Sequence, residues 1–212
     1  MKVISTNIAQ PTTVIKNGKS VKTGIYKTHV KDGITLGLTD VVGDAVMDRK
    51  HHGGIDKACY LYSADHYSFW QEKFPDLHWT HGMFGENLTV DGLDESQINI
   101  GDTFEIGKTI IQVSEPRRPC SILGIRFGTQ AIVKEFYHQP YPGIYVRVLK
   151  EGKIKKGDSF KLIKKEKNSI SVAAVYSLFA KDDKNHELAK KAILIDTLAD
   201  STKNDLITRF KL

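Results

Sequence analysis

Short runs of β-branched, aromatic and other apolar residues, separated by tight turns, recur along the first two-thirds of the chain. Residues 14–16 and 19–21 flank Asn17-Gly18, a pair that readily adopts the positive φ angles of a type I′ turn, and this pattern predicts a β-hairpin. Residues 104–106 and 109–113 flank a second turn that contains glycine. Many short strands joined in this way predict a barrel or a strongly bent sheet.

Later segments continue the β pattern. Residues 144–149 alternate in part and are rich in β-branched and aromatic side chains. Residues 98–106 and 154–162 form a weak internal repeat in which Gly-Asp precedes a strand, and Gly43-Asp44 resembles the same start. We interpret this Gly-Asp pair as a tight turn that opens a strand, rather than as part of a ligand site.

Helical patterns interrupt the strands at two places. In the first, Ser63 is a suitable N-cap, and Tyr67, Trp70 and Phe74 recur at helical spacing before Pro75. We assign this aromatic stripe to the core rather than to the stacking of bases. The second helical region is predicted to run from residue 121 to about residue 137.

The pattern changes at the polar run 164–168, which is typical of a linker. Three helical patterns follow it: residues 172–179, residues 187–198, and a segment after Ser201. The chain therefore divides into a mainly β region with some helix at 1–165 and a three-helix region at 169–212. Fewer than about 50 residues bury little core, so we expect these helices to dock on the β region or on another subunit, which allows a homodimer.

Composition places the chain among soluble globular proteins and excludes a disordered, collagen-like or wholly coiled-coil chain. It has 212 residues, of which 40% are hydrophobic and 26% charged. Lys and Arg number 31 against 25 Asp and Glu, for a net charge of +6. This excess suits an anionic partner, such as a phosphorylated cofactor, an acidic surface or nucleic acid. Nucleic acid is the least favoured because the basic residues are dispersed and are not interleaved with aromatic ones.

The chain carries no sequence signal for export or membrane insertion. Its N-terminus has one positive charge and no long apolar run, and no segment approaches the roughly 18 apolar residues of a spanning helix. Two cysteines do not make a disulfide framework. We therefore expect a cytoplasmic protein without a membrane partner.

The two cysteines differ in their surroundings. Cys59 lies in the apolar run 58–62, which is typical of a core strand, and we assign it to packing. Cys120 follows Arg117, Arg118 and Pro119 at a predicted helix start. Positive neighbours and a helix N-terminus favour the thiolate, which is both the reactive form and the form that binds soft metals. The alternative for Cys120 is a small buried apolar residue.

Two further clusters are candidates for chemistry. In residues 48–57, two histidines stand beside paired glycines and a lysine, a pattern that suits an oxyanion site. Zinc is less favoured because His51 and His52 are adjacent and have no partner three or four residues away, and a charged surface turn is an equal alternative. In residues 81–90, Glu86 and Asn87 either orient a ligand by hydrogen bonds or shape a turn.

Taken in order, these segments resemble the MOSC domain, the C-terminal domain of molybdenum cofactor sulfurases, and within that family the YiiM-like subgroup. The resemblance spans nearly the whole chain, including the three-helix region. The matching segments are residues 43–44, 52–54, 57–58, 85–88, 116–120, 143–148 and 157–158.

The resemblance implies a mixed β-barrel that holds a molybdenum–pterin cofactor, with Cys120 as the molybdenum ligand. It also implies reduction of N-hydroxylated compounds, such as hydroxylamino purines, with electrons from a separate flavin or iron–sulfur protein. Binding of pyridoxal phosphate is a further family-level possibility. The candidate catalytic residues are Cys120, His52, Asp56 and Glu86. The candidate cofactor-binding residues, chosen to hold phosphate and other anionic groups, are His51, His52, Lys57, Asn87, Arg118 and Arg147.

Two other functions remain open at this point. Cys120 could carry a persulfide in sulfur or cofactor transfer. The chain could also bind a pterin or phosphate without catalysis.

Overall fold

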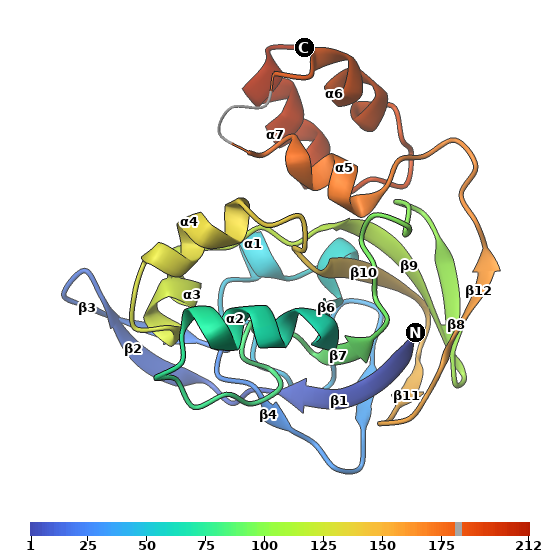
Figure 1. The fold of residues 1–212 in the computed structure, drawn as a ribbon. Helices are drawn as coiled ribbons and strands as arrows, with labels where there is room; N and C mark the ends of the chain where they lie inside the picture. The colour runs from blue at the N-terminus through green and yellow to red at the C-terminus, as the bar shows by residue number, and fades with distance from the viewer. Residues whose placement is uncertain (181–183) are drawn as a thin grey trace.

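An eight-stranded sheet forms the centre of the molecule, and helices cover parts of it (Figure 1). The computed structural model describes residues 1–180 and 184–212, with all their side chains but that of Lys50. The strands are β1 (Lys2–Ile8), β2 (Thr12–Lys16), β3 (Lys19–Thr23), β4 (Thr28–His29), β5 (Ile34–Leu36), β6 (Cys59–Ser63), β7 (Leu88–Asp91), β8 (Thr103–Ile106), β9 (Thr109–Pro116), β10 (Ile144–Lys150), β11 (Gly152–Ile154) and β12 (Phe160–Lys164). The helices are α1 (Arg49–His52), α2 (Tyr67–Lys73), α3 (Ser121–Arg126), α4 (Ala131–Tyr137), α5 (Val172–Ser177), α6 (His186–Ile193) and α7 (Asp200–Phe210), with short 3-10 turns η1 (Ile55–Lys57) and η2 (Ala64–His66).

The sheet has the strand order β12-β8-β9-β10-β6-β7-β1-β4. Its neighbours are antiparallel except for β6 and β7, which are parallel and are joined through α2. The prediction of a mainly β fold with some helix is therefore confirmed.

The expected closed barrel is corrected to a bent, open sheet. Its edge strands β12 and β4 are not paired with each other. The N-terminal end of β1 meets the start of β12 at one β-bridge, between Lys2 and Ser159. Three backbone hydrogen bonds flank this bridge: Val3 N donates to Asp158 O at 2.9 Å, Gly157 N to Val3 O at 2.8 Å, and Phe160 N to Met1 O at 3.1 Å. Most of β12 pairs with β8 instead, so the ladder does not continue around the molecule.

The hairpin predicted around Asn17-Gly18 is present as β2 and β3. Val14 lies opposite Val21, and both turn residues have positive φ, 50° at Asn17 and 74° at Gly18. This hairpin forms a separate two-stranded sheet. It reaches out from the main sheet and forms one wall of the site described below (Figure 1).

Two groups of buried side chains make up the core. A mainly aliphatic group joins the sheet to the C-terminal helices and includes Ile106, Ile111 and Val146. An aromatic group lies between the sheet and helices α2 to α4, where Trp70 stacks on Phe136 with ring centroids 5.6 Å apart. The predicted aromatic stripe is thus part of the core.

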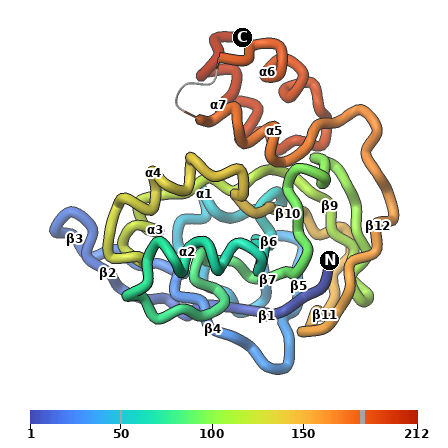
Figure 2. Tube along the Cα trace, in the orientation of Figure 1, coloured from blue at the N-terminus to red at the C-terminus, as the bar shows by residue number. Residues whose placement is uncertain are grey.

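The C-terminal helices lie against the sheet (Figure 2). Docking on the β region was one of the two arrangements expected from the sequence. Val172, Val175 and Leu206 belong to the same buried cluster as the sheet interior. Ala199 N donates to Ser114 O in β9 at 3.1 Å. Docking supplies the buried surface that three short helices lack on their own.

Three predicted segments differ in detail. Residues 121–137 form two helices because a turn with Gly128 at φ 69° separates α3 from α4. The helix expected to reach residue 198 ends at Ile193. The run 164–168 is anchored rather than free, because Lys165 and the Glu166 amide both bond to the buried Asp102 carboxylate, at 2.7 Å and 2.9 Å.

Candidate functional site

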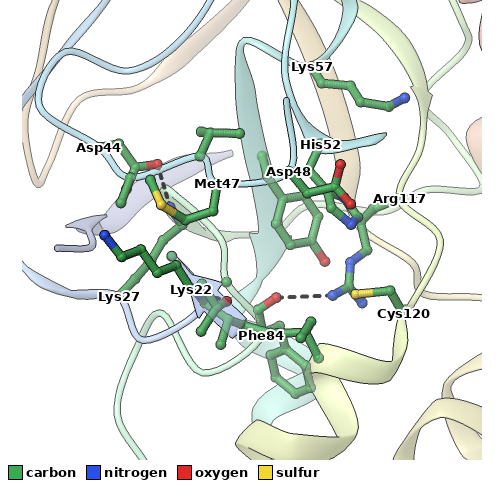
Figure 3. A pocket seen from close by; sticks show the side chains of 18 of the residues that line it. Lys22, Lys27, Asp44, Met47, Asp48, His52, Lys57, Phe84, Arg117 and Cys120 are labelled. Carbon is green, nitrogen blue, oxygen red and sulfur yellow. Dashed lines mark hydrogen bonds and ion pairs between the residues drawn. The ribbon is translucent and has the colours of Figure 1, made fainter. Parts of the chain in front are cut away.

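A cavity of about 230 Å³ lies between the β2–β3 hairpin, the segment before α1 and the start of α3 (Figure 3). Segments distant in sequence line it: residues 16, 21–25, 27, 44–48, 52, 57, 60, 84, 85, 87, 117, 120–122 and 145. Its charged side chains are five lysines and arginines against two aspartates, together with His52. The cavity therefore suits an anionic ligand.

Cys120 lies in this cavity at the N-cap of α3, with an extended backbone at φ −126° and ψ 169°. Burial opposes ionisation of the thiol, but a hydrogen bond from His52, the positive charge of Arg117 and the amide of Ile122 outweigh it. Together they lower the pKa of Cys120 from 9.0 to about 6. The thiolate is therefore the main form at neutral pH.

His52 is the last residue of α1 and faces the cavity. Its Nδ1 lies 3.5 Å from the hydroxyl oxygen of Tyr145, which also lines the cavity. The side chain of Asp48 accepts from the His51 amide at 3.3 Å and so caps α1. This short helix thus brings His52 to Cys120.

Arg117 is the buried cation of the site. Its side chain lies over the rings of Tyr60 and Phe136, 5.5 Å and 5.1 Å from their centroids. One guanidinium nitrogen, Nη2, donates to Phe84 O at 3.4 Å, whereas the buried Nη1 has no partner within the described part of the chain. A buried charge that is not paired with a carboxylate is costly, and it favours an anion nearby.

Arg118 was predicted to bind the cofactor, but Arg117 is the arginine that lines the cavity. Neighbouring residues of an extended segment point in opposite directions, so only one of the two arginines can face the cavity. Arg118 instead pairs with Asp205 of α7 at 2.5 Å and lies over the ring of Phe179. The signal for Arg117 was present in the same motif, but the sequence carried no information about its direction.

Asp44 has a larger role than the turn that was predicted for Gly43-Asp44. Its carboxylate forms a buried ion pair with Lys27, and the two side chains are 2% and 6% exposed. Asn87 Nδ2 donates to Asp44 Oδ2 at 2.8 Å, and Asn87 Oδ1 accepts from Tyr60 N at 3.2 Å. The Gly-Asp turn is therefore more than the start of a strand, because Asp44 holds two residues of the cavity wall. Asn87 lines the cavity, and its amide is already bonded to protein.

Lys57 reaches the cavity from η1 and is held from the opposite side by the C-terminal region. Its Nζ lies 3.2 Å from Glu115 Oε1 and 3.3 Å from Ser201 Oγ. Glu115 is buried and also accepts from the hydroxyl of Thr202 in α7. The C-terminal helices thus help to position a cation of the site.

Several predicted site residues lie outside the cavity lining. Glu86 is fully buried and accepts from Gly82 N at 2.7 Å, Phe84 N at 3.1 Å, Thr89 Oγ1 at 2.8 Å and the hydroxyl of Tyr67. Its carboxylate shapes the loop that presents Phe84, which lines the cavity.

Asp56, Arg147 and His51 also lie outside the lining. Asp56 forms an ion pair with Arg147, whose Nη1 donates to Thr197 O at 2.6 Å and so joins β10 to the C-terminal region. His51 is exposed and lies 2.9 Å from the Asp48 carboxylate. The positions of these three residues favour structural roles.

Cys59 is fully buried in β6, and burial raises the pKa of its thiol. Its assignment to the core is confirmed. Across residues 1–180 and 184–212, no group of three His, Cys, Asp or Glu side chains is arranged to hold a metal ion. None of the helices in those ranges is long and apolar enough to cross a bilayer.

Comparison with known proteins matches this arrangement to a family. The sequence profile of the MOSC domain matches residues 48–161, which include His52, Arg117 and Cys120. The chain belongs to the MOSC domain family. This MOSC protein is 37% identical over 199 residues to YflK of Bacillus subtilis, a match that covers 94% of this chain and 90% of the relative.

Two other relatives extend the comparison. YiiM of Escherichia coli is 31% identical over 173 residues, which cover 79% of this MOSC protein and 77% of YiiM. A protein of Gibberella moniliformis named "Reductase" is 33% identical over 162 residues, which are 74% of this chain and 28% of that longer protein.

The crystal structure of YiiM from Geobacillus stearothermophilus superposes with a TM-score of 0.82 at 28% identity and covers 99% of this chain and 98% of its own. The likeness therefore includes the C-terminal helices, and the predicted YiiM-like MOSC protein is confirmed.

Proposed function

We propose that this MOSC protein binds a molybdenum–pterin cofactor in the 230 Å³ cavity, with Cys120 as the protein ligand of molybdenum. We further propose that it reduces N-hydroxylated compounds with electrons from a separate flavin or iron–sulfur protein. The observation that carries the proposal is a thiol with a pKa of about 6 beside an unpaired buried arginine. A relative that bears the name "Reductase" supports redox chemistry in this family.

The residues present fit such a cofactor. A thiolate is a soft ligand that suits a metal already held by sulfur ligands of its own, so a single protein ligand is enough. The cofactor is anionic, and Arg117 Nη1, which has no partner among the described residues, is a cationic donor at the cavity. Lys57 Nζ, which is paired with Glu115, is a further donor there. Lys16 and Lys22 of the hairpin add positive charge to the cavity lining and would help to hold a phosphate group.

When bound, the cofactor would supply two-electron chemistry and an acceptor for the oxygen of the N–O bond. Overall, R–NHOH takes up two electrons and two protons and gives R–NH₂ and water. His52 is the side chain of the site best placed to move a proton, because it contacts Cys120 and its ring is oriented towards Tyr145. Arg117 offsets negative charge at the thiolate.

The cavity walls suggest the kind of substrate. Ile25, Met47, Phe84 and Ile122 give it an apolar side next to its charged groups. Such a wall suits a flat aromatic ring, as in a hydroxylamino purine, with the N–O group turned towards Cys120.

The test is to purify the protein from a host that makes the cofactor and to assay molybdenum and pterin. Cys120→Ala is expected to lose the metal and the reductase activity measured with a supplied electron donor. Cys59→Ala, which removes the other cysteine, is expected to keep the metal. Full metal content and activity in Cys120→Ala would overturn the ligand assignment.

The same low pKa supports a second candidate, in which Cys120 carries a persulfide for sulfur transfer. That function predicts labelled sulfane sulfur on Cys120 in protein that contains no molybdenum. The metal assay and the sulfur label therefore separate the two functions.

A further inference from the structure

A second cavity, of about 410 Å³, lies beside the segment that follows the β2–β3 hairpin. Lys27 lines both cavities, so this segment stands between them. The second cavity is lined by Ile4, Ser5, Tyr26, Lys27, Thr28, His29, Thr80, His81, Arg126 and Lys156. These residues come from β1, the segment between β3 and β4, β4 itself, the loop after α2, the end of α3 and the turn before β12.

The charged groups of this cavity are all basic. Lys27 is neutralised by Asp44, but His29, His81, Arg126 and Lys156 have no ion pair among the described side chains. No carboxylate belongs to the described lining. Arg126 and Lys156 therefore bring positive charge to the cavity from two separate segments, and the two imidazoles add to it when they are protonated.

Arg126 has an unused donor here. Its Nε is buried and has no hydrogen-bond partner in the described part of the molecule. Its guanidinium lies 4.7 Å from the centre of the Tyr26 ring, which orients the group without supplying an acceptor. A buried donor without an acceptor costs free energy that a bound oxyanion would recover.

The basic groups also repel one another. Burial first, and then the positive charges of Lys156 and His29, lower the pKa of His81, against the opposing effect of Glu86. Among the described residues, Glu86 is the one carboxylate whose charge raises the pKa of both His81 and Arg126. Its oxygens already accept hydrogen bonds from Gly82, Phe84, Thr89 and Tyr67. It is therefore not free to pair with Arg126.

We propose that this second cavity is a binding site for the phosphoryl group of a small phosphorylated molecule. Arg126 and Lys156 would bind the phosphoryl oxygens, with the hydroxyl of Thr80 as a further polar partner. Tyr26 provides an aromatic wall for the organic part of the ligand. This site is separate from the cofactor cavity and does not depend on the function proposed for it.

The experiment follows the His81 imidazole by NMR in the full-length protein during pH titrations, with and without phosphate ligands. Inorganic phosphate tests the phosphoryl site, and phenyl phosphate tests whether an organic ester binds better. Bound phosphate is expected to raise the pKa of His81 because the anion stabilises the imidazolium. An unchanged His81 titration at saturating concentrations of both ligands would overturn the proposal.

Variants locate the bound anion. Arg126→Gln and Lys156→Gln are each expected to weaken binding about tenfold, since each removes a charge-assisted hydrogen bond. Lys155→Gln is the matched control, because it removes an equal charge from the neighbouring residue, which does not line the cavity. Lys156 is exposed, so its variant is expected to fold even if Arg126→Gln does not. Equal weakening by Lys155→Gln and Lys156→Gln would mean that phosphate is attracted only by the net charge of the protein, and this result would overturn the site.

Stronger binding of phenyl phosphate than of inorganic phosphate supports an organic ester as the ligand, whereas equal binding overturns that part of the proposal.

Discussion

At the scale of single residues, the environment rather than the residue type decides the chemistry of this protein. Cys59 and Cys120 are the same side chain, yet burial raises the pKa of one thiol, and His52 and Arg117 lower the pKa of the other to about 6. Arg117 and Arg118 differ in the same way. One is buried without a carboxylate at the thiolate, and the other forms an ion pair at a partly exposed surface.

Replacing Arg117 separates its electrostatic role from its contribution to folding. In cofactor-free protein, alkylation of Cys120 is expected to be half-maximal near pH 6, to slow below that pH as the thiol protonates, and to leave Cys59 unmodified. Arg117→Met is expected to move the midpoint towards 9.0, because it removes a cation that favours the thiolate. Below pH 6, where the thiol is protonated, the free energy of unfolding is expected to stay equal or rise, because a buried charge without an anionic partner is removed. Arg118→Met is the control and is expected to leave the midpoint unchanged. An unchanged midpoint in Arg117→Met would contradict the conclusion that the Arg117 charge lowers the pKa of Cys120.

At the scale of elements, a few side chains hold the short segments around the site by accepting hydrogen bonds from their backbone amides. The loop that carries Phe84 is the main example, because the Glu86 carboxylate accepts from two of its amides as well as from Tyr67 and Thr89. Helix α1 is held in a similar way by Asp48. These bonds turn irregular segments into fixed walls of the cavity.

Glu86→Ala is expected to lower the free energy of unfolding by at least about 2 kcal/mol, because it leaves several buried donors without an acceptor. Chemical denaturation with urea measures this loss. Glu72→Ala makes the same change on the exposed face of α2 and is expected to stay within about 0.5 kcal/mol of the wild type. Equal effects of the two substitutions would argue against a structural role for the buried carboxylate.

At the scale of the whole molecule, the C-terminal region is tied to the β region at three places, one of which reaches a residue of the cavity. Thr202 donates to Glu115, which holds Lys57 at the cavity. Thr197 O accepts from Arg147, and Asp205 pairs with Arg118. The helices therefore stabilise the side of the sheet that carries the site.

Thr202→Val tests the tightest of these ties. Valine keeps the shape of threonine but removes the donor to buried Glu115, so unfolding is expected to become easier by about 1–3 kcal/mol. Thr208→Val, an exposed change in the same helix, is expected to alter stability by less than about 0.5 kcal/mol. Thermal unfolding of both variants checks the difference, and a loss as small in Thr202→Val as in Thr208→Val would contradict the proposed tie.

Local pattern was enough for much of the fold. The β2–β3 hairpin, the strands around Gly107 and most helix positions depend on turn residues and apolar spacing, which act over a few residues. Barrel closure was not predictable in this way. It depends on whether β1 and β12, at opposite ends of the β region, pair along their length, and they meet only around the Lys2–Ser159 bridge at the N-terminal end of β1.

The sequence by itself determined the family, the turn-rich β fold with its C-terminal helices, and the difference between Cys59 and Cys120, because each has a short-range or motif-level signal. Only the tertiary structure decided which charged residues share the site. It brought Arg117, Lys27 and Asp44 to the cavity and placed Arg147 and Glu86 in structural networks. The physical reason is that side-chain direction and ion pairing depend on strand register and on contacts between segments far apart in the chain, which no local pattern encodes.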